Sequence, residues 1–121
     1  MTDQEIVTKL AQKLYERKAS DIVALRVGHL TVLCDYMLIA SGRTAAQVSA
    51  MVDEADELMS GLGITLRRSE GANEGRWAVL DYGSVMVHLF HKDEREYYRL
   101  ERLWNDGTNE IELPLDQSVE D

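Results

Sequence analysis

The feature that most constrains the fold is a pair of short alternating segments, residues 76–81 and 85–90, on either side of Tyr82-Gly83-Ser84. Successive side chains of a strand point to opposite faces of a sheet. With a two-residue turn the segments form a hairpin, and its register assigns each side chain to one face. One face is wholly apolar and should meet helices: Ala78, Leu80, Val85, Val87 and Leu89. The other face mixes apolar and polar groups: Trp77, Val79, Asp81, Met86, His88 and Phe90.

The rest of the chain alternates helical and extended patterns. Thr2 and Thr44 each begin a capping-box pattern, completed by Glu5 and Gln47. Apolar residues at helical spacing predict helices over residues 2–18, 44–61 and 93–104, the last with a buried stripe of Tyr97, Leu100, Leu103 and Trp104. Besides the hairpin, strands are predicted at residues 20–27, 33–40 and 64–68. We therefore expect one α/β domain over residues 1–104, a small mixed β-sheet packed with helices in the order α-β-β-α-β-β-β-α.

Charge sets the last part of the chain apart. The net charge is −9, and six acidic residues but no basic one follow Trp104. We expect residues 105–121 to form an acidic, flexible tail. An acidic chain repels a phosphate backbone, so direct recognition of nucleic acid is not expected. Without an apolar run of about 20 residues or the pattern of a signal peptide, we expect a cytoplasmic location and no membrane contact.

Residues that could carry chemistry are few and scattered. Cys34 has no second cysteine, and a small buried side chain is favoured over a nucleophile. His88 and His91 straddle a strand end and should point to opposite faces, so no metal site is expected. The turn at residues 41–44 lacks the glycines and lysine of a phosphate-binding loop, which favours a helix cap. Asp81 has no paired carboxylate for a two-metal mechanism. We expect no enzyme and no cofactor, with a metal-dependent nucleotidyltransferase-like enzyme using Asp81 as an alternative.

A surface is the remaining candidate for function. Trp77 and Phe90 on the mixed face, and Tyr82 at the turn, are large groups near loop edges. The carboxylates of Glu70, Asp81 and Asp93 are close to them in sequence. Aromatic anchors beside acids are typical of a binding site for a basic protein. The alternative is that Trp77 only covers the second side of the sheet.

Four segments in their order and spacing resemble the ribosomal silencing factor family, also called the RsfS or Iojap family. These are residues 35–44 (DYMLIASGRT), Glu70-Gly71, residues 77–90 (WAVLDYGSVMVHLF) and residues 95–104 (REYYRLERLW). The resemblance covers about residues 3–104, and the tail after Trp104 is expected to lie outside the family pattern. It implies a fold related to nucleotidyltransferases but without catalytic residues, in agreement with the isolated Asp81.

The resemblance also implies a function. Members bind the large ribosomal subunit through its protein fourteen, block association with the small subunit and so repress translation. Some relatives act in assembly of organelle ribosomes, which leaves large-subunit assembly as an alternative, and members often form homodimers. An acidic chain suits a basic ribosomal protein better than it suits RNA. Carried over by motif, the residues expected at the partner-binding surface are Glu70, Trp77, Asp81, Tyr82 and His88.

Overall fold

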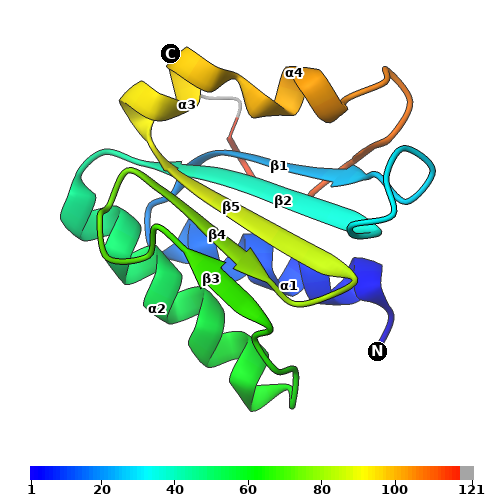
Figure 1. Ribbon diagram of the computed structural model, residues 1–121, viewed down its shortest axis with the longest axis horizontal. Coiled ribbons are helices and arrows are strands. Elements are labelled where there is room, and N and C mark those ends of the chain that lie inside the picture. Colours follow the sequence, from blue (N-terminus) through cyan, green and yellow to red (C-terminus); the bar gives the residue numbers. More distant parts are fainter. Residues whose placement is uncertain (118–121) are drawn as a thin grey trace.

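A computed structural model describes residues 1–117 as a six-stranded sheet between two pairs of helices (Figure 1). The sheet order is β3-β4-β5-β2-β1-β6. Strands β2 and β5 run parallel and the other neighbours antiparallel, so the sheet is mixed as predicted. The elements are α1 Asp3–Glu16, β1 Ser20–Arg26, β2 Tyr36–Gly42, α2 Ala45–Gly61, β3 Arg68–Glu70, β4 Trp77–Asp81, β5 Val85–His91, α3 Lys92–Tyr98, α4 Leu100–Trp104 and β6 Glu110–Ile111.

The two long helices begin at the predicted threonines, but their caps differ. At α1, the Thr2 hydroxyl accepts the Glu5 N–H and the Glu5 carboxylate accepts the Thr2 N–H, which is a complete capping box. At α2, the Thr44 hydroxyl accepts the Gln47 N–H. The Gln47 side chain instead accepts the Arg43 N–H and donates to the carbonyl of Lys18, so the second predicted capping box is only half formed. Gln47 thereby ties the start of α2 to the end of α1.

The hairpin has the predicted register. The Tyr82 N–H donates to the Val85 carbonyl, which leaves Gly83 and Ser84 as a two-residue loop. Gly83 has φ +92°, a conformation that glycine adopts without strain. The face predicted to be apolar lies in the main core, under α1 and α2: Ala78, Leu80, Val85, Val87 and Leu89.

A second core lies on the opposite side of the sheet. Its buried members are Leu25, Val27, Cys34, Met37, Ile39 and Phe90, with Leu100 and Trp104 of α4 packed against them. Residues 37–42 are therefore buried on both faces, as their continuous apolar run predicted. In the described residues, no helix has the length and apolar character to cross a membrane.

The predicted third helix is wrong in its middle and in its buried stripe. The helix breaks at Arg99, whose φ and ψ are both 49°, and this residue separates α3 from α4. The break leaves Tyr97 81% exposed and Leu103 74% exposed, although both were predicted to be buried. Arg95 is buried instead, where Nη1 donates to Ser41 Oγ at 2.7 Å and Nε to Glu101 Oε1 at 2.9 Å.

The predicted strand at residues 64–68 is shifted along the chain. The observed β3 spans Arg68–Glu70, because its pairing is set by β4, with Arg68 opposite Asp81 and Glu70 opposite Val79. Residues 64–66 precede the ladder, and the Arg67 N–H donates to the Asp81 carbonyl just before it.

The acidic tail also differs from the expected flexible segment over residues 105–117. Its strand β6 pairs with β1, and Ile111 is buried in the main core. The buried Asn109 side chain donates to the carbonyls of Arg26 and Trp104. The Gln117 amide accepts from the N–H of Ile22 and donates to its carbonyl. The tail therefore covers the edge of β1, while residues 118–121 lie outside the described part of the chain.

Candidate functional site

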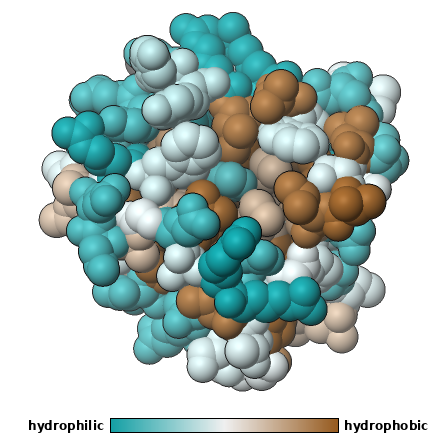
Figure 2. All heavy atoms as spheres, viewed as in Figure 1, coloured by the Kyte–Doolittle hydropathy of each residue, from teal (hydrophilic) through white to brown (hydrophobic). Residues whose placement is uncertain are grey.

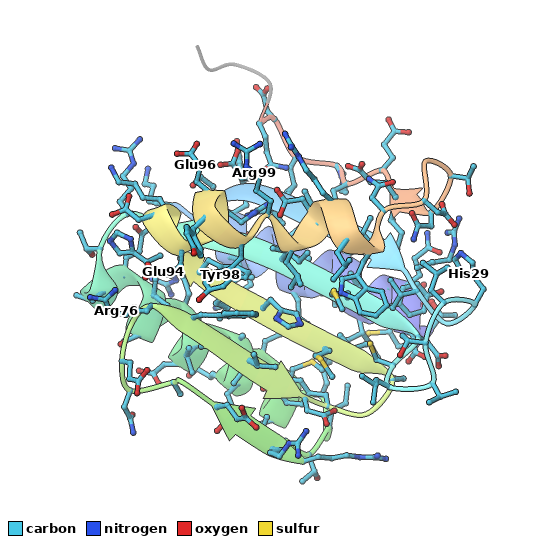
Figure 3. The ribbon with its side chains drawn as sticks, turned by 45° about the horizontal axis from the view of Figure 1, so that its top comes forward. His29, Arg76, Glu94, Glu96, Tyr98 and Arg99 are labelled. Atoms are coloured by element: carbon cyan, nitrogen blue, oxygen red, sulfur yellow. The ribbon has the colours of Figure 1, made fainter. Side chains whose placement is uncertain are left out.

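One half of the outer sheet face is not covered by a helix. α3 and α4 lie over β1, β2 and the neighbouring part of β5, and leave β3, β4 and the rest of β5 open (Figure 3). Strand pairing places side chains of these three strands on the same side. We call this surface the open face, and its residues are Arg68, Glu70, Trp77, Val79, Asp81, Met86 and His88.

Trp77 is the centre of the aromatic groups on the open face. Its ring stacks on Phe90 with centroids 4.8 Å apart, and the ring of Tyr98 lies 4.8 Å away on α3. Its indole N–H donates to His88 Nδ1 at 3.1 Å. Trp77 remains half-buried. It therefore packs on the second core, as the covering alternative predicted, and its partial exposure leaves a contact with a partner as a prediction.

Burial and the hydrogen bond from Trp77 hold the His88 imidazole in one protonation state and one tautomer. Its side chain is 7% exposed, and burial lowers its pKa to about 4, so the imidazole is neutral at pH 7. Because Nδ1 accepts the Trp77 N–H, the proton of the neutral ring is on Nε2. Among the described residues, Nε2 is buried and has no hydrogen-bond partner.

The two predicted carboxylates of the open face differ in exposure and in their hydrogen bonds. Glu70 is exposed, and its only ion pair among residues 1–117 is a loose one with Arg68 at 3.9 Å. Asp81 is half-buried, and its Oδ1 accepts the Gly83 N–H at 2.8 Å. Asp81 therefore helps to shape the hairpin turn, whereas Glu70 is available to a basic partner.

Tyr82 is not brought to the open face. It is 6% exposed in the main core, and its hydroxyl donates to Asp56 Oδ1 of α2 at 2.8 Å. Burial and this hydrogen bond raise the pKa of Tyr82 well above its usual range. The exposed aromatic group next to Trp77 is instead Tyr98, which is 51% exposed and which the sequence pattern did not single out as a site residue.

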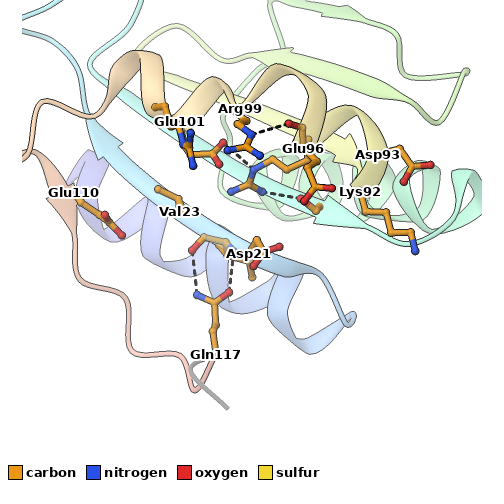
Figure 4. A pocket seen from close by; sticks show the side chains of 13 residues that line it. Asp21, Val23, Lys92, Asp93, Glu96, Arg99, Glu101, Glu110 and Gln117 are labelled. Atoms are coloured by element: carbon orange, nitrogen blue, oxygen red, sulfur yellow. Dashed lines mark hydrogen bonds and ion pairs between the residues drawn. The ribbon is translucent and has the colours of Figure 1, made fainter. Parts of the chain in front are cut away.

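A polar cavity of about 820 Å³ lies away from the open face, between β1, the α3–α4 segment and the tail (Figure 4). Charges of both signs line it: Lys92, Arg95, Arg99 and Arg102, with Asp21, Asp93, Glu96, Glu101 and Glu110. Ser41 belongs to the turn that resembles a phosphate-binding loop in outline. Its hydroxyl accepts a hydrogen bond from Arg95 here. Asp81 does not line this cavity. The residues that a transferase would need together are therefore apart.

The other candidate chemical groups have structural partners. Cys34 is buried, and burial, with a smaller effect of Asp81, raises the pKa of its thiol to about 11, so it is not activated as a nucleophile. His91 Nδ1 accepts the Asp93 N–H at the start of α3. Within residues 1–117, no group of three or more histidine, cysteine, aspartate or glutamate side chains could hold a metal ion.

Exposed apolar side chains mark a second part of the surface. In Figure 2 apolar groups gather over the region of α4 and the loop between β1 and β2. The exposed members there are Leu30, Val32, Leu33 and Leu103. Contiguous apolar surface of this kind is typical of protein contacts.

Comparisons with known proteins agree with the fold and the motifs. The family model described as ribosomal silencing factor during starvation (RsfS) matches residues 1–121, so the tail after Trp104 lies within the family pattern, contrary to our expectation. The chain is 39% identical to a ribosomal silencing factor of Halalkalibacterium halodurans over 113 residues, 93% of this chain and 97% of the relative. It is 30% identical to a mouse protein named for mitochondrial assembly of the ribosomal large subunit, over 81% of this chain and 44% of that protein.

A solved structure gives the same result. A crystal structure of a protein from Chromobacterium violaceum superposes with a TM-score of 0.83 at 30% sequence identity, covering 98% of this chain and 97% of the other. The family match over the whole chain, the high identity and the shared fold lead to one conclusion. The chain belongs to the ribosomal silencing factor family.

Proposed function

We propose that this chain binds the large ribosomal subunit through the open face, contacts its protein fourteen there, and blocks association with the small subunit. The observation that carries the proposal is a half-buried Trp77 on an uncovered sheet face, beside an exposed carboxylate at Glu70. A fixed aromatic group loses little entropy on binding, and a nearby acid steers a basic partner towards it. The mechanism is steric exclusion in the cytoplasm, with no chemical step.

Charge supports a protein contact rather than a direct RNA contact. The chain carries a net charge of −9, so a phosphate backbone would be repelled at most of its surface. Ribosomal proteins are basic, and Glu70 has a weak ion pair to exchange for a stronger one. Asp81 contributes negative potential at the same face while its Oδ1 holds the turn.

The experiment is cosedimentation of the protein with purified large and small subunits. We expect binding to free large subunits and loss of joined ribosomes as the protein is added. Glu70→Arg reverses an exposed charge on the open face and should weaken binding about tenfold without affecting folding. Glu57→Arg is the matched control, since Glu57 is exposed on α2, on the other side of the sheet. Binding to small subunits alone, or equal effects of the two reversals, would contradict the proposal.

A role in assembly of the large subunit is the second candidate, because the mouse relative carries that function in its name. The two roles predict different particles after deletion of the gene. Immature large subunits should accumulate if the chain acts in assembly. Mature large subunits that join small subunits too readily during starvation would indicate silencing.

The homodimer implied by the resemblance has a candidate surface in the exposed apolar residues of the β1–β2 loop and α4. Val32 is 102% exposed there and lies among other exposed apolar side chains rather than alone, which is typical of a contact surface. We propose that Val32→Asp lowers dimer formation in sedimentation equilibrium. A wild-type chain that is monomeric at high concentration would refute this.

A further inference from the structure

The most unusual group on the open face is the Nε2–H of His88. Buried N–H groups in native proteins almost always have an acceptor, because leaving one unpaired is costly. The indole N–H of Trp77 occupies Nδ1, so the proton of the neutral ring is on Nε2. Among the described residues, Nε2 is buried and unpaired. Residues 1–117 therefore hold a donor in a fixed position and offer it no acceptor.

The neighbours of His88 explain why the chain itself does not satisfy this donor. On the paired strands, His88 lies opposite Val79 of β4 and Ile39 of β2, and neither side chain has a polar atom. Trp77 is a donor and cannot accept from a second N–H through its indole nitrogen. Phe90, whose ring is 6.4 Å from the imidazole, is also apolar. Within residues 1–117 no side chain or carbonyl accepts from Nε2, so the position is open to an acceptor that a partner supplies.

We infer that His88 is a specificity-determining residue of the open face, and that its Nε2–H donates to a backbone carbonyl of the bound ribosomal protein. This rests on the proposed function. A carbonyl fits better than a carboxylate, because Glu70 and Asp81 lie on the same face and repel a second negative charge. A partner that does not place an oxygen here leaves the donor unpaired in the complex and is discriminated against.

Access to the donor requires a local movement. Because Nε2 is buried in the free chain, a neighbouring side chain must turn away before an acceptor reaches it. Tyr98 suits this role, since its ring packs on Trp77 at 4.8 Å and is 51% exposed. It precedes the break at Arg99, where the chain is not held in a continuous helix. Because Tyr98 packs on Trp77, the hydrogen-bond partner of His88, we expect a partner that displaces this ring to bring its acceptor towards Nε2.

Two substitutions of His88 separate the donor from the rest of the side chain. In His88→Asn the amide oxygen can take the place of Nδ1 and accept from Trp77, but no donor reaches the position of Nε2. In His88→Gln the longer amide places an N–H near that position. We expect His88→Asn to lower affinity for purified large subunits about tenfold or more, and His88→Gln to remain within about threefold of the wild type. Near-UV circular dichroism reports whether the environment of Trp77 is preserved.

A measurement on the wild type avoids dependence on how the variants fold. Long-range nitrogen–proton NMR spectra should show the Nε2–H tautomer of His88 in the free protein. On addition of isolated protein fourteen, the Nε2 proton should shift downfield and exchange more slowly with solvent. An Nδ1–H tautomer, or saturating binding that leaves this proton unchanged, would overturn the inference.

The outcomes distinguish the inference from the proposed function. If Trp77→Ala abolishes binding while both His88 variants bind like the wild type, the open face remains the docking surface and the role of His88 is refuted. An equal loss in both variants would indicate packing alone and also refute it. If the wild type does not bind large subunits, or if Trp77→Ala and both His88 variants all bind normally, the docking surface and the inference fall together.

Discussion

Replacement of Ile111 by alanine tests whether the acidic tail is part of the folded domain. Ile111 is 5% exposed in the main core, although it belongs to a two-residue strand at the sheet edge. Truncation of a buried isoleucine to alanine costs about 2 to 5 kcal/mol, and an edge position that can close partly around the gap should be near the lower end. We expect a loss of about 2 kcal/mol. For a chain of this size that lowers the melting temperature by about 6 to 12 °C.

The assay is thermal and urea unfolding of Ile111→Ala beside Glu112→Ala, whose side chain is exposed one position further along. The control should unfold within about 0.5 kcal/mol of the wild type. Hydrogen exchange adds a local measurement, because the Arg26 N–H donates to the Asn109 carbonyl at 2.8 Å and should lose protection in Ile111→Ala. Equal midpoints for the two variants, with Arg26 unprotected in the wild type, would show that the tail is mobile and refute the reasoning.

Three further predictions follow from individual side chains. Tyr82→Phe removes the hydrogen bond to Asp56 and should cost about 1 to 2 kcal/mol of stability while leaving large-subunit binding unchanged, because Tyr82 lies in the main core. Cys34 should react with iodoacetamide at pH 8 far more slowly than a free thiol until the protein is unfolded, because burial raises its pKa to about 11. The folded pKa of His88 is about 4, below the unfolded value near 6.5, so the unfolded state binds more protons between these values and wild-type stability should fall as pH drops from 6.5 to 4. The extra loss relative to His88→Gln should be about 3 kcal/mol, and parallel stability curves would contradict it.

The hairpin shows how far alternation can predict a fold. Its two-residue loop and its apolar face were both predicted, because a period of two leaves one consistent register. The same rule also assigns Tyr82, two positions after Leu80, to the main core. We expected Tyr82 at the partner-binding surface because the family motif includes it and it is near the turn, but the parity of its position argued against that placement.

Two other differences between prediction and structure had a weaker signal in the sequence, or none. The break at Arg99 occurs at a non-glycine residue in the left-handed region, which no local pattern predicts. It arises where Arg95 turns inward to Ser41, a contact between residues 54 positions apart. The tail did carry a signal, since Ile111, Leu113 and Leu115 alternate with Glu110, Glu112, Pro114 and Asp116. We predicted a flexible segment from its acidic residues and did not use this alternation of period two, which is typical of a strand.

The position of the open face follows from how the two faces of the sheet are used. The inner face is filled by α1 and α2, so its side chains are committed to the core. The outer face has only the short α3 and α4, which cover β1, β2 and the neighbouring part of β5. The outer face of β3 and β4 therefore has no helix over it, and Trp77 and His88 are hydrogen-bonded to each other at the boundary of the covered part. Trp77 at this boundary is held by the core on one side and partly exposed on the other, which fixes a binding group without a dedicated pocket.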